Sequence, residues 1–253
     1  MKRILSLLLL FLGAALSFGQ VRVPGFEGSS GGAAVSGPWT LANHQSYAAT
    51  GGVASISTPA FSSPLTSGSI IVVFVWDGSG NTGVMPPPTD TAGNIYVDSG
   101  SGTAVNSSGG RAQVFVARNF NTTLSNVVTA SIGGMYYPMI LAVEWTGSVA
   151  SVPVNGHSIC AGCGDSAGLA PDNMATSGMT TTADGDLILG LFVTNGHSPF
   201  VPGTGYTQIA SSSSLFLVEY LTQTTAGPIV VRGTDAWGYG QPYVGLGLAL
   251  ARN

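Results

Sequence analysis

Two glutamates lie in strand-like segments, and each is followed by an aromatic residue, in Val143-Glu144-Trp145 and Val218-Glu219-Tyr220. Glycoside hydrolases use two carboxyl groups about 5–10 Å apart, one as acid and one as nucleophile or base. Both side chains would have to project from one face of a sheet. A strand glutamate more often faces solvent or pairs with arginine, so Glu144 and Glu219 are kept only as an alternative catalytic pair.

The sequence carries neither a Gly-x-Ser-x-Gly nucleophile motif nor a Gly-rich phosphate loop that leads into a helix. No catalytic residue is therefore assigned, and a non-catalytic role is favoured.

Both cysteines of the chain fall in the cluster His157-x-x-Cys160-x-x-Cys163. In an oxidising compartment two such cysteines form a disulfide, which reduces the entropy of the unfolded chain. Thiolate and imidazole groups also bind Zn²⁺ or Cu⁺, so His157, Cys160 and Cys163 are an alternative metal site, with Asp165 or His197 as a further ligand. A redox-active pair would need a helix N-terminus to lower the thiol pKa, and no helix is predicted here. The disulfide is favoured.

Aromatic residues next to glycines suggest a loop that presents rings to a sugar. The segment Trp237-Gly238-Tyr239-Gly240, followed by Tyr243, is the best such cluster, and we predict that Trp237, Tyr239 and Tyr243 contact a ligand, with buried packing of these rings as an equal alternative. Trp76 and Trp145 lie in apolar strands and are interpreted as packing residues. The remaining aromatics considered for a stacking platform are Trp39, Tyr136 and Tyr137.

The segment Asp90-Thr91-Ala92-Gly93-Asn94 has the composition of a turn, because Asp accepts hydrogen bonds from nearby amides and Gly adopts a positive φ. Asp90 and Asn94 could instead offer oxygen ligands to Ca²⁺. No dense run of acidic residues would complete that shell. The turn is favoured, no cofactor is assigned, and Ca²⁺ is the alternative.

The elements that would position these residues are strands: short β-branched runs bounded by Gly, Ser, Pro, Asn or Asp, without a convincing 3.6-residue apolar period. The clearest are Ser69–Trp76, Ala112–Arg118, Val127–Ile132, Ile140–Trp145, Asp186–Thr194, Ser214–Leu221, Ile229–Arg232 and Tyr243–Ala251; weaker ones are Val53–Thr58, Ile95–Ser99, Ala175–Thr181 and Tyr206–Ala210. The pattern predicts a single antiparallel β-sandwich of jelly-roll type with roughly twelve strands.

The order of these runs is weakly duplicated. One copy extends from Ser67 to Gly147 and the other from Asp184 to Leu250, and each opens and closes with an apolar strand. We interpret the copies as halves of one sandwich. Between them, residues 150–174 are predicted to form a long loop.

The first nineteen residues have the composition of a signal peptide, with a basic start and an apolar run from Ile4 to Leu16. Cleavage is expected after Ser17 or Gly19. Residues 20–49 are then a leader of uncertain order, and 50–253 the sandwich domain. We expect a secreted, periplasmic or cell-surface protein with no membrane span once the signal is removed.

Charge is scarce in the rest of the chain. The only lysine, Lys2, lies in the signal segment, which leaves five arginines against eleven acidic residues, a formal charge of −6. Such a chain has no phosphate-tracking surface, so nucleic acid is an unsuitable partner, and so is an anionic membrane. An uncharged polar surface suits an extracellular polysaccharide or a surface glycan.

Three stretches of the chain, Thr50–Trp76, Thr89-Asp90-Thr91-Ala92-Gly93-Asn94-Ile95-Tyr96 and Leu141–Gly147, resemble a group of exported bacterial proteins with a jelly-roll or lectin-like sandwich. Proteins of that group often contain a Val-Thr-Asp-x-x-Gly-Asn-x-Tyr hairpin. The resemblance implies a fold and no reaction. We therefore expect a non-catalytic binding or surface module with a carbohydrate ligand. The alternatives are a glycoside hydrolase or lyase and a structural, self-associating protein, which long apolar strands with free edges would permit.

Overall fold

The computed structural model describes residues 38–78, 83–100, 104–105, 110–164, 174–194, 199–211, 215–235 and 242–252. Every regular element within these ranges is a β-strand, and all strand pairs are antiparallel. The predicted all-β antiparallel class is confirmed. None of the described segments forms a helix that could cross a membrane. The predicted signal peptide, Trp237 and Tyr239 lie outside the described residues.

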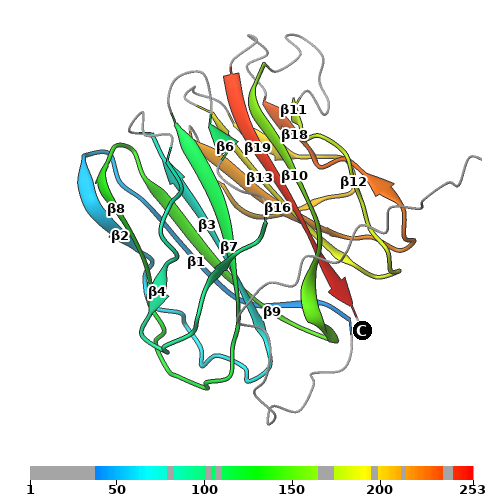
Figure 1. Ribbon diagram of the computed structural model, residues 1–253, viewed down its shortest axis with the longest axis horizontal. Helices are drawn as coiled ribbons and strands as arrows, with labels where there is room; N and C mark the ends of the chain where they lie inside the picture. Colours follow the sequence, from blue (N-terminus) through cyan, green and yellow to red (C-terminus); the bar gives the residue numbers. More distant parts are fainter. Residues whose placement is uncertain are drawn as a thin grey trace, which may run out of the picture.

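Two large sheets face each other at the centre of the molecule (Figure 1). The first inner sheet has the order β1-β9-β3-β7-β5, and β6 also pairs with β7. Its strands are β1 (Thr40–Ala48), β9 (Met139–Thr146), β3 (Ile70–Asp77), β7 (Arg111–Arg118), β5 (Val97–Asp98) and β6 (Ala104–Val105). The second inner sheet has the order β10-β19-β13-β16-β15. Its strands are β10 (Val149–Gly164), β19 (Pro242–Arg252), β13 (Leu187–Thr194), β16 (Phe216–Thr222) and β15 (Thr207–Ser211).

Smaller sheets form two outer layers. The order β2-β8-β4 accompanies the first inner sheet, and β11-β18-β14 together with the pair β12-β17 accompanies the second. The bounds are β2 (Val53–Ser57), β8 (Val128–Met135), β4 (Thr89–Asp90), β11 (Met174–Ala175), β18 (Arg232–Asp235), β14 (Phe200–Pro202), β12 (Met179–Thr180) and β17 (Pro228–Ile229).

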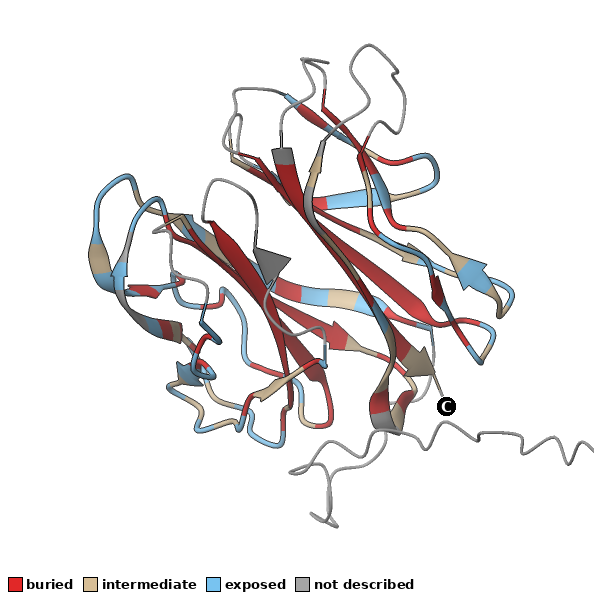
Figure 2. Ribbon diagram, turned by 45° about the horizontal axis from the view of Figure 1, so that its top comes forward, coloured by how far each residue is buried: buried red, intermediate tan, exposed pale blue. Residues whose placement is uncertain are grey.

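Three apolar cores hold these layers together, and the central strands β3 and β13 are buried along their length (Figure 2). Successive side chains of a strand point to opposite faces. In β3, Ile70, Val72 and Phe74 therefore enter the central core between the inner sheets, whereas Ile71 and Val73 enter the first outer core. This double burial explains the uninterrupted apolar runs of β3 and β13, and it confirms their predicted place as central strands.

The two halves of the chain repeat one topology, since β1, β9, β3, β7 and β5 occupy the places of β10, β19, β13, β16 and β15. A matching turn precedes β3 and β13. In the first half, Gly68 N donates to Asn119 O at 2.7 Å, and Asn119 N donates to Ser69 O at 2.9 Å. In the second half, Gly185 N donates to Gln223 O and Gln223 N donates to Asp186 O, each at 2.8 Å. Gly68 and Gly185 have φ of +84° and +82°, which glycine adopts without strain. The duplication seen in the sequence is therefore a duplication of structure.

The halves face each other as the subunits of a two-fold dimer do. Strand β7 of the first half contacts β19 of the second. The strands that correspond to these two in the opposite halves are β16 and β9. They also meet, because the ring centroids of Tyr220 in β16 and Trp145 in β9 are 4.9 Å apart. This contact therefore occurs twice with exchanged partners, as in an isologous interface.

Two long edge strands contradict the sequence predictions. Residues 150–174 were predicted to be a loop, but β10 occupies Val149–Gly164; residues 40–48 were placed in a leader, but they form β1. Both strands mix polar and apolar residues and are irregular in register, with shifts at Leu41/Asn43 in β1 and at three places in β10. A β-bulge breaks the period-2 alternation by which strands are recognised. The predicted strand Ile229–Arg232 is also wrong, because β17 ends at its start and β18 begins at its end. The described residues hold nineteen strand segments rather than about twelve.

Candidate functional site

The turn between β4 and β5 is organised by the carboxylate of Asp90. Its Oδ1 accepts a hydrogen bond from Asn94 N at 2.9 Å, and its Oδ2 accepts from Asn94 Nδ2 and Tyr96 Oη, each at 2.8 Å, and from Asn126 Nδ2 at 3.1 Å. Gly93 has a φ of +75°. The predicted turn is confirmed. The carboxylate oxygens are directed at four protein donors, so they do not form the open oxygen site that Ca²⁺ would require.

Asn126 holds the same turn from the neighbouring segment. Its Oδ1 accepts hydrogen bonds from Ala92 N at 3.0 Å and from Thr91 Oγ1 at 3.1 Å. Burial, and then the neighbouring Asp90 carboxylate, raise the pKa of the Tyr96 phenol well above its ordinary value. Tyr96 therefore stays protonated and donates to Asp90, which fixes the shape of the β4–β5 connection. Strands β4 and β5 pair with β8 and β7 rather than with each other, and we refer to their connection as the hairpin for its sharp turn.

A pocket of about 130 Å³ lies between this hairpin and the chain that leaves β7. Its lining residues are Gly93, Asn94, Ile95, Val97, Arg118, Phe120 and Asn121. The two walls are joined because Val97 pairs with Val116 in the sheet and Asn121 Nδ2 donates to Ala92 O at 2.6 Å. Ile95 is 74% and Phe120 43% exposed. We call this set of residues the hairpin pocket.

Among the described residues, Arg118 is the only charged one that lines the hairpin pocket. It is half-buried, burial lowers its pKa, and its Nη1 donates a long hydrogen bond of 3.4 Å to Ala150 O. At the opposite end of β7, Arg111 instead forms a buried ion pair with Asp77 at 3.0 Å. Arg118 has no such carboxylate partner in the part of the chain that the structure describes.

The second half of the chain offers an internal comparison. Ile70 pairs with Arg118 in the first half, and the corresponding Leu187 pairs with Thr222 in the second. Since Asn119 and Gln223 make matching turn bonds, the position of Phe120 corresponds to Thr224. The arginine and the aromatic ring of the hairpin pocket are therefore features of the first half alone.

Glu144 and Glu219 are completely buried and lie on opposite sides of the molecule's central core. Glu144, on the outer face of β9, accepts hydrogen bonds from Asn43 Nδ2 at 2.5 Å and Thr66 N at 2.6 Å. Glu219, on the outer face of β16, accepts from Gly203 N at 2.9 Å. Each carboxylate accepts hydrogen bonds from groups in its own half of the chain. The alternative of a catalytic pair is therefore wrong, because the two groups cannot act on one sugar.

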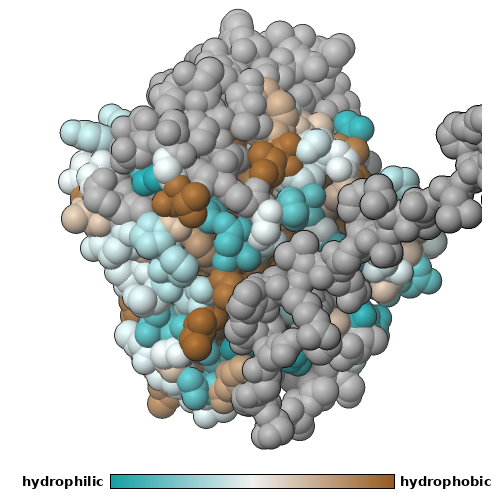
Figure 3. Space-filling model, viewed as in Figure 1, coloured by the Kyte–Doolittle hydropathy of each residue, from teal (hydrophilic) through white to brown (hydrophobic). Residues whose placement is uncertain are grey.

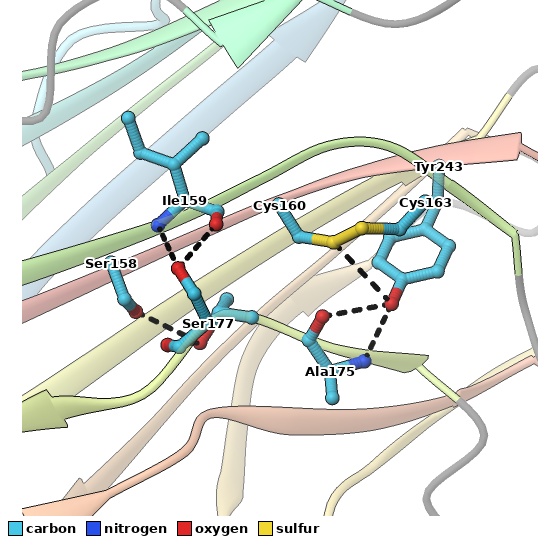
Figure 4. Close-up of a disulfide and its surroundings, with 8 residues drawn as sticks. Ser158, Ile159, Cys160, Cys163, Ala175, Ser177 and Tyr243 are labelled. Carbon is cyan, nitrogen blue, oxygen red and sulfur yellow. Dashed lines mark hydrogen bonds between the residues drawn. A yellow bond between two sulfur atoms is a disulfide. The ribbon is translucent and has the colours of Figure 1, made fainter.

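Cys160 and Cys163 form the predicted disulfide in β10, across a register shift between Ala161 and Cys163 (Figure 4). The sulfur atoms are therefore not thiolates, and the alternative metal site with His157 is contradicted; the side chain of His157 is exposed on β10. Among the described residues, no group of three or more His, Cys, Asp or Glu could hold a metal ion.

Tyr243 lies beside the disulfide and is buried, with 3% of its surface exposed. Its hydroxyl accepts a hydrogen bond from Ala175 N and donates to Ala175 O, each at 2.8 Å (Figure 4). Its predicted contact with a ligand is therefore wrong: the ring ties β11 to β19. Trp237 and Tyr239, predicted with it, lie outside the described residues. Trp76 and Trp145 are buried, as the sequence indicated, and Tyr136 and Tyr137 are exposed.

Comparisons of the chain with family models, with curated proteins and with solved structures found no match. The assignment of a site therefore depends on geometry. The sequence analysis did not single out Arg118, Phe120 or Asn121. One signal was present: Arg118-Asn119-Phe120-Asn121 places an arginine and an aromatic ring directly after an apolar strand, in a chain with few arginines.

Proposed function

We propose that this protein is an exported, non-catalytic module that binds carbohydrate, and that the hairpin pocket is its binding site. The observation that carries the proposal is the exposed ring of Phe120 beside polar side chains on a rigid hairpin. Secretion and a cell-surface or extracellular polysaccharide partner belong to the same proposal. A jelly-roll or lectin-like sandwich is the proposed fold type, supported by two-layered antiparallel halves.

The lining of the hairpin pocket matches the two kinds of surface on a sugar ring. The C–H faces of a sugar pack on apolar groups, here Phe120 and Ile95, while its hydroxyls need donors and acceptors at the rim. The side-chain amides of Asn94 and Asn121 and the guanidinium of Arg118 lie there. The pocket is a local one lined by residues of two neighbouring segments, so we propose that it contacts one sugar residue rather than a long stretch of polymer.

The described part of one face of the molecule is compatible with contact to a hydrated polymer. Figure 3 shows one face of the molecule, on which apolar atoms form separate patches between polar ones rather than a continuous apolar surface. A protein partner that buries a large area would favour a broad apolar patch.

A structural or self-associating role, the other non-catalytic candidate, has weaker support. Its sequence argument was a free strand edge, and part of the edge of β10 is occupied by a side chain. Ile159 N donates to Ser177 Oγ at 3.2 Å, and the same hydroxyl donates to Ile159 O at 2.5 Å (Figure 4). A side chain that satisfies these groups blocks the addition of another strand at that point.

The test is a binding assay on residues 20–253 against a panel of insoluble polysaccharides and immobilised oligosaccharides. We expect selective binding by the wild-type protein and a loss of about tenfold in Phe120→Ala, which removes the stacking ring. Leu124→Ala is the matched control, because Leu124 is also an exposed apolar residue after β7 but does not line the pocket. An equal loss in both variants, or no binding to any sugar, would overturn the proposal.

A further inference from the structure

We propose that the sugar bound in the hairpin pocket carries an anionic group, and that Arg118 binds that group. This inference rests on the proposed function and narrows its ligand class. The anion is a carboxylate, as in a uronic acid, or a sulfate ester, and the same guanidinium chemistry recognises both.

The first argument is the position of the charge. Arg118 lies half-buried in a pocket wall, and its one hydrogen bond in the structure is the 3.4 Å contact to Ala150 O. A partly desolvated guanidinium is stabilised by a carboxylate or a similar anion, because charge-assisted bonds offset the loss of water. The described part of the chain supplies such a partner to Arg111, through Asp77, and none to Arg118.

The second argument is that nearby acidic residues are committed elsewhere. Asp90 lies at the base of the hairpin, and its oxygens accept the four hydrogen bonds described above. Asp98 follows Val97 in β5, but it accepts hydrogen bonds from Gln113 Nε2 and, at 2.7 Å, from Gly100 N. Neither residue lines the pocket. A ligand anion would therefore meet a positive group and neutral amides.

The third argument comes from the duplication. If the strand end required an arginine for folding, the second half should also carry one at the corresponding position. It carries Thr222. The shared topology therefore does not itself require an arginine at this position, and the long contact to Ala150 O is the hydrogen bond that the described residues give Arg118. A ligand anion would provide the guanidinium with stronger partners.

The chemistry also explains why an arginine is suitable. The guanidinium is planar, stays charged at neutral pH and offers paired donors that match a carboxylate or a sulfate in a two-bond geometry. Phe120 follows two residues later and provides the apolar surface for the ring that bears the anion. Arg118 would bind the anionic group, and Phe120 would pack against the ring of the same sugar.

The experiment uses residues 20–253 and short oligosaccharides, because long polyanions would be repelled by an acidic protein. The probes are a galacturonic acid trimer, its methyl ester, in which the carboxylate is neutral, and a sulfated trimer of galactose. Calorimetry measures their affinities for wild type, Arg118→Gln, Arg118→Lys and Arg232→Gln. The last variant removes an exposed arginine of β18, so it matches the change in net charge at a distance from the pocket.

We expect the wild type to bind the acid or the sulfated trimer at least about tenfold more tightly than the methyl ester. Arg118→Gln should reduce this preference to within about twofold, Arg118→Lys should keep part of it, and Arg232→Gln should keep all of it. A preference for one anion identifies the source as carboxylate or as sulfate.

Equal affinity of the wild type for charged and neutral trimers, with binding still lost in Phe120→Ala, would overturn this inference and leave the proposed function intact. A preference that survives Arg118→Gln in a folded variant would overturn it as well. Absence of binding to every trimer and to the polysaccharide panel would overturn both. Circular dichroism and a thermal melt establish that each variant is folded.

Discussion

Replacing Asp90 by alanine should destabilise the protein more than any other single change on its surface hairpins. The substitution leaves four donors without their acceptor: Asn94 N, Asn94 Nδ2, Asn126 Nδ2 and the hydroxyl of Tyr96. The side-chain amide of the half-buried Asn94 can turn toward water. The Asn126 amide and the Tyr96 hydroxyl are the costly groups, because these residues are 0% and 3% exposed and burial of an unsatisfied polar group is unfavourable.

The size of the effect follows from these contacts. A net contribution of about 1 kcal/mol for each hydrogen bond gives a loss of about 4 kcal/mol in the free energy of unfolding. Asp90→Asn retains the side-chain volume and one oxygen acceptor. Its NH2 group is a donor, so it cannot accept the hydrogen bonds that the second carboxylate oxygen accepts in the wild type. We expect about half of the loss, about 2 kcal/mol.

Urea unfolding, followed by far-UV circular dichroism, measures both values, with a constant denaturant slope as the check that the same unfolding is compared. Asp184→Ala is the control, because this exposed aspartate accepts one bond, from Ala226 N at 2.7 Å, and its loss should cost less than about 1 kcal/mol. A loss in Asp90→Ala no larger than in the control would refute the reasoning. Asp90→Ala should also weaken sugar binding, because the hairpin forms one wall of the pocket.

Three further predictions concern packing, covalent structure and pH. Gly190→Ala should cost about 1–3 kcal/mol, because the new methyl group would overlap Val231 of the outer layer, whereas Gly51→Ala, with open space around it, should be neutral in the same urea assay. Cys160→Ser removes the disulfide and should lower the free energy of unfolding by at most about 2 kcal/mol, because the closed loop is short; reduction of the wild type should have the same effect. Tyr96 has a raised folded-state pKa, so its contribution to stability is fully present below the unfolded value near 10 and is lost as the pH rises through the folded value; Tyr96→Phe should be less stable than wild type at pH 8, and the difference should shrink at pH 11.

The central strands could be predicted because a strand that is buried on both faces has an uninterrupted apolar sequence. Runs such as Ile70–Val75 and Leu187–Val193 are uninterrupted because the residues of each run alternate between two cores. The Asp90 turn could also be predicted, since Asp and Gly have specific local roles in turns. These features depend on neighbours in sequence, and they were confirmed.

The edge strands and the pocket could not be predicted, because they depend on contacts between distant segments. Strand β1 is polar and pairs with β9 across about a hundred residues; Asn43, for example, donates to Glu144. The hairpin pocket exists only because the pairing of β5 with β7 brings Ile95 next to Phe120. Glu144 and Glu219 were kept as an alternative catalytic pair for the same reason: the sequence shows their strands but not the backbone groups whose hydrogen bonds they accept.

The separate strand pairings of the two halves have a consequence for how the chain folds. In the described residues, every strand pair joins two strands of the same half. The first half can therefore complete its backbone pairing as soon as β9 has been synthesised. Its inner face, with Phe74, Leu141 and Trp145, then remains open to water until β13 and β19 have been made. A nascent chain at this stage is prone to aggregate, so its folding yield should depend on how quickly the second half follows.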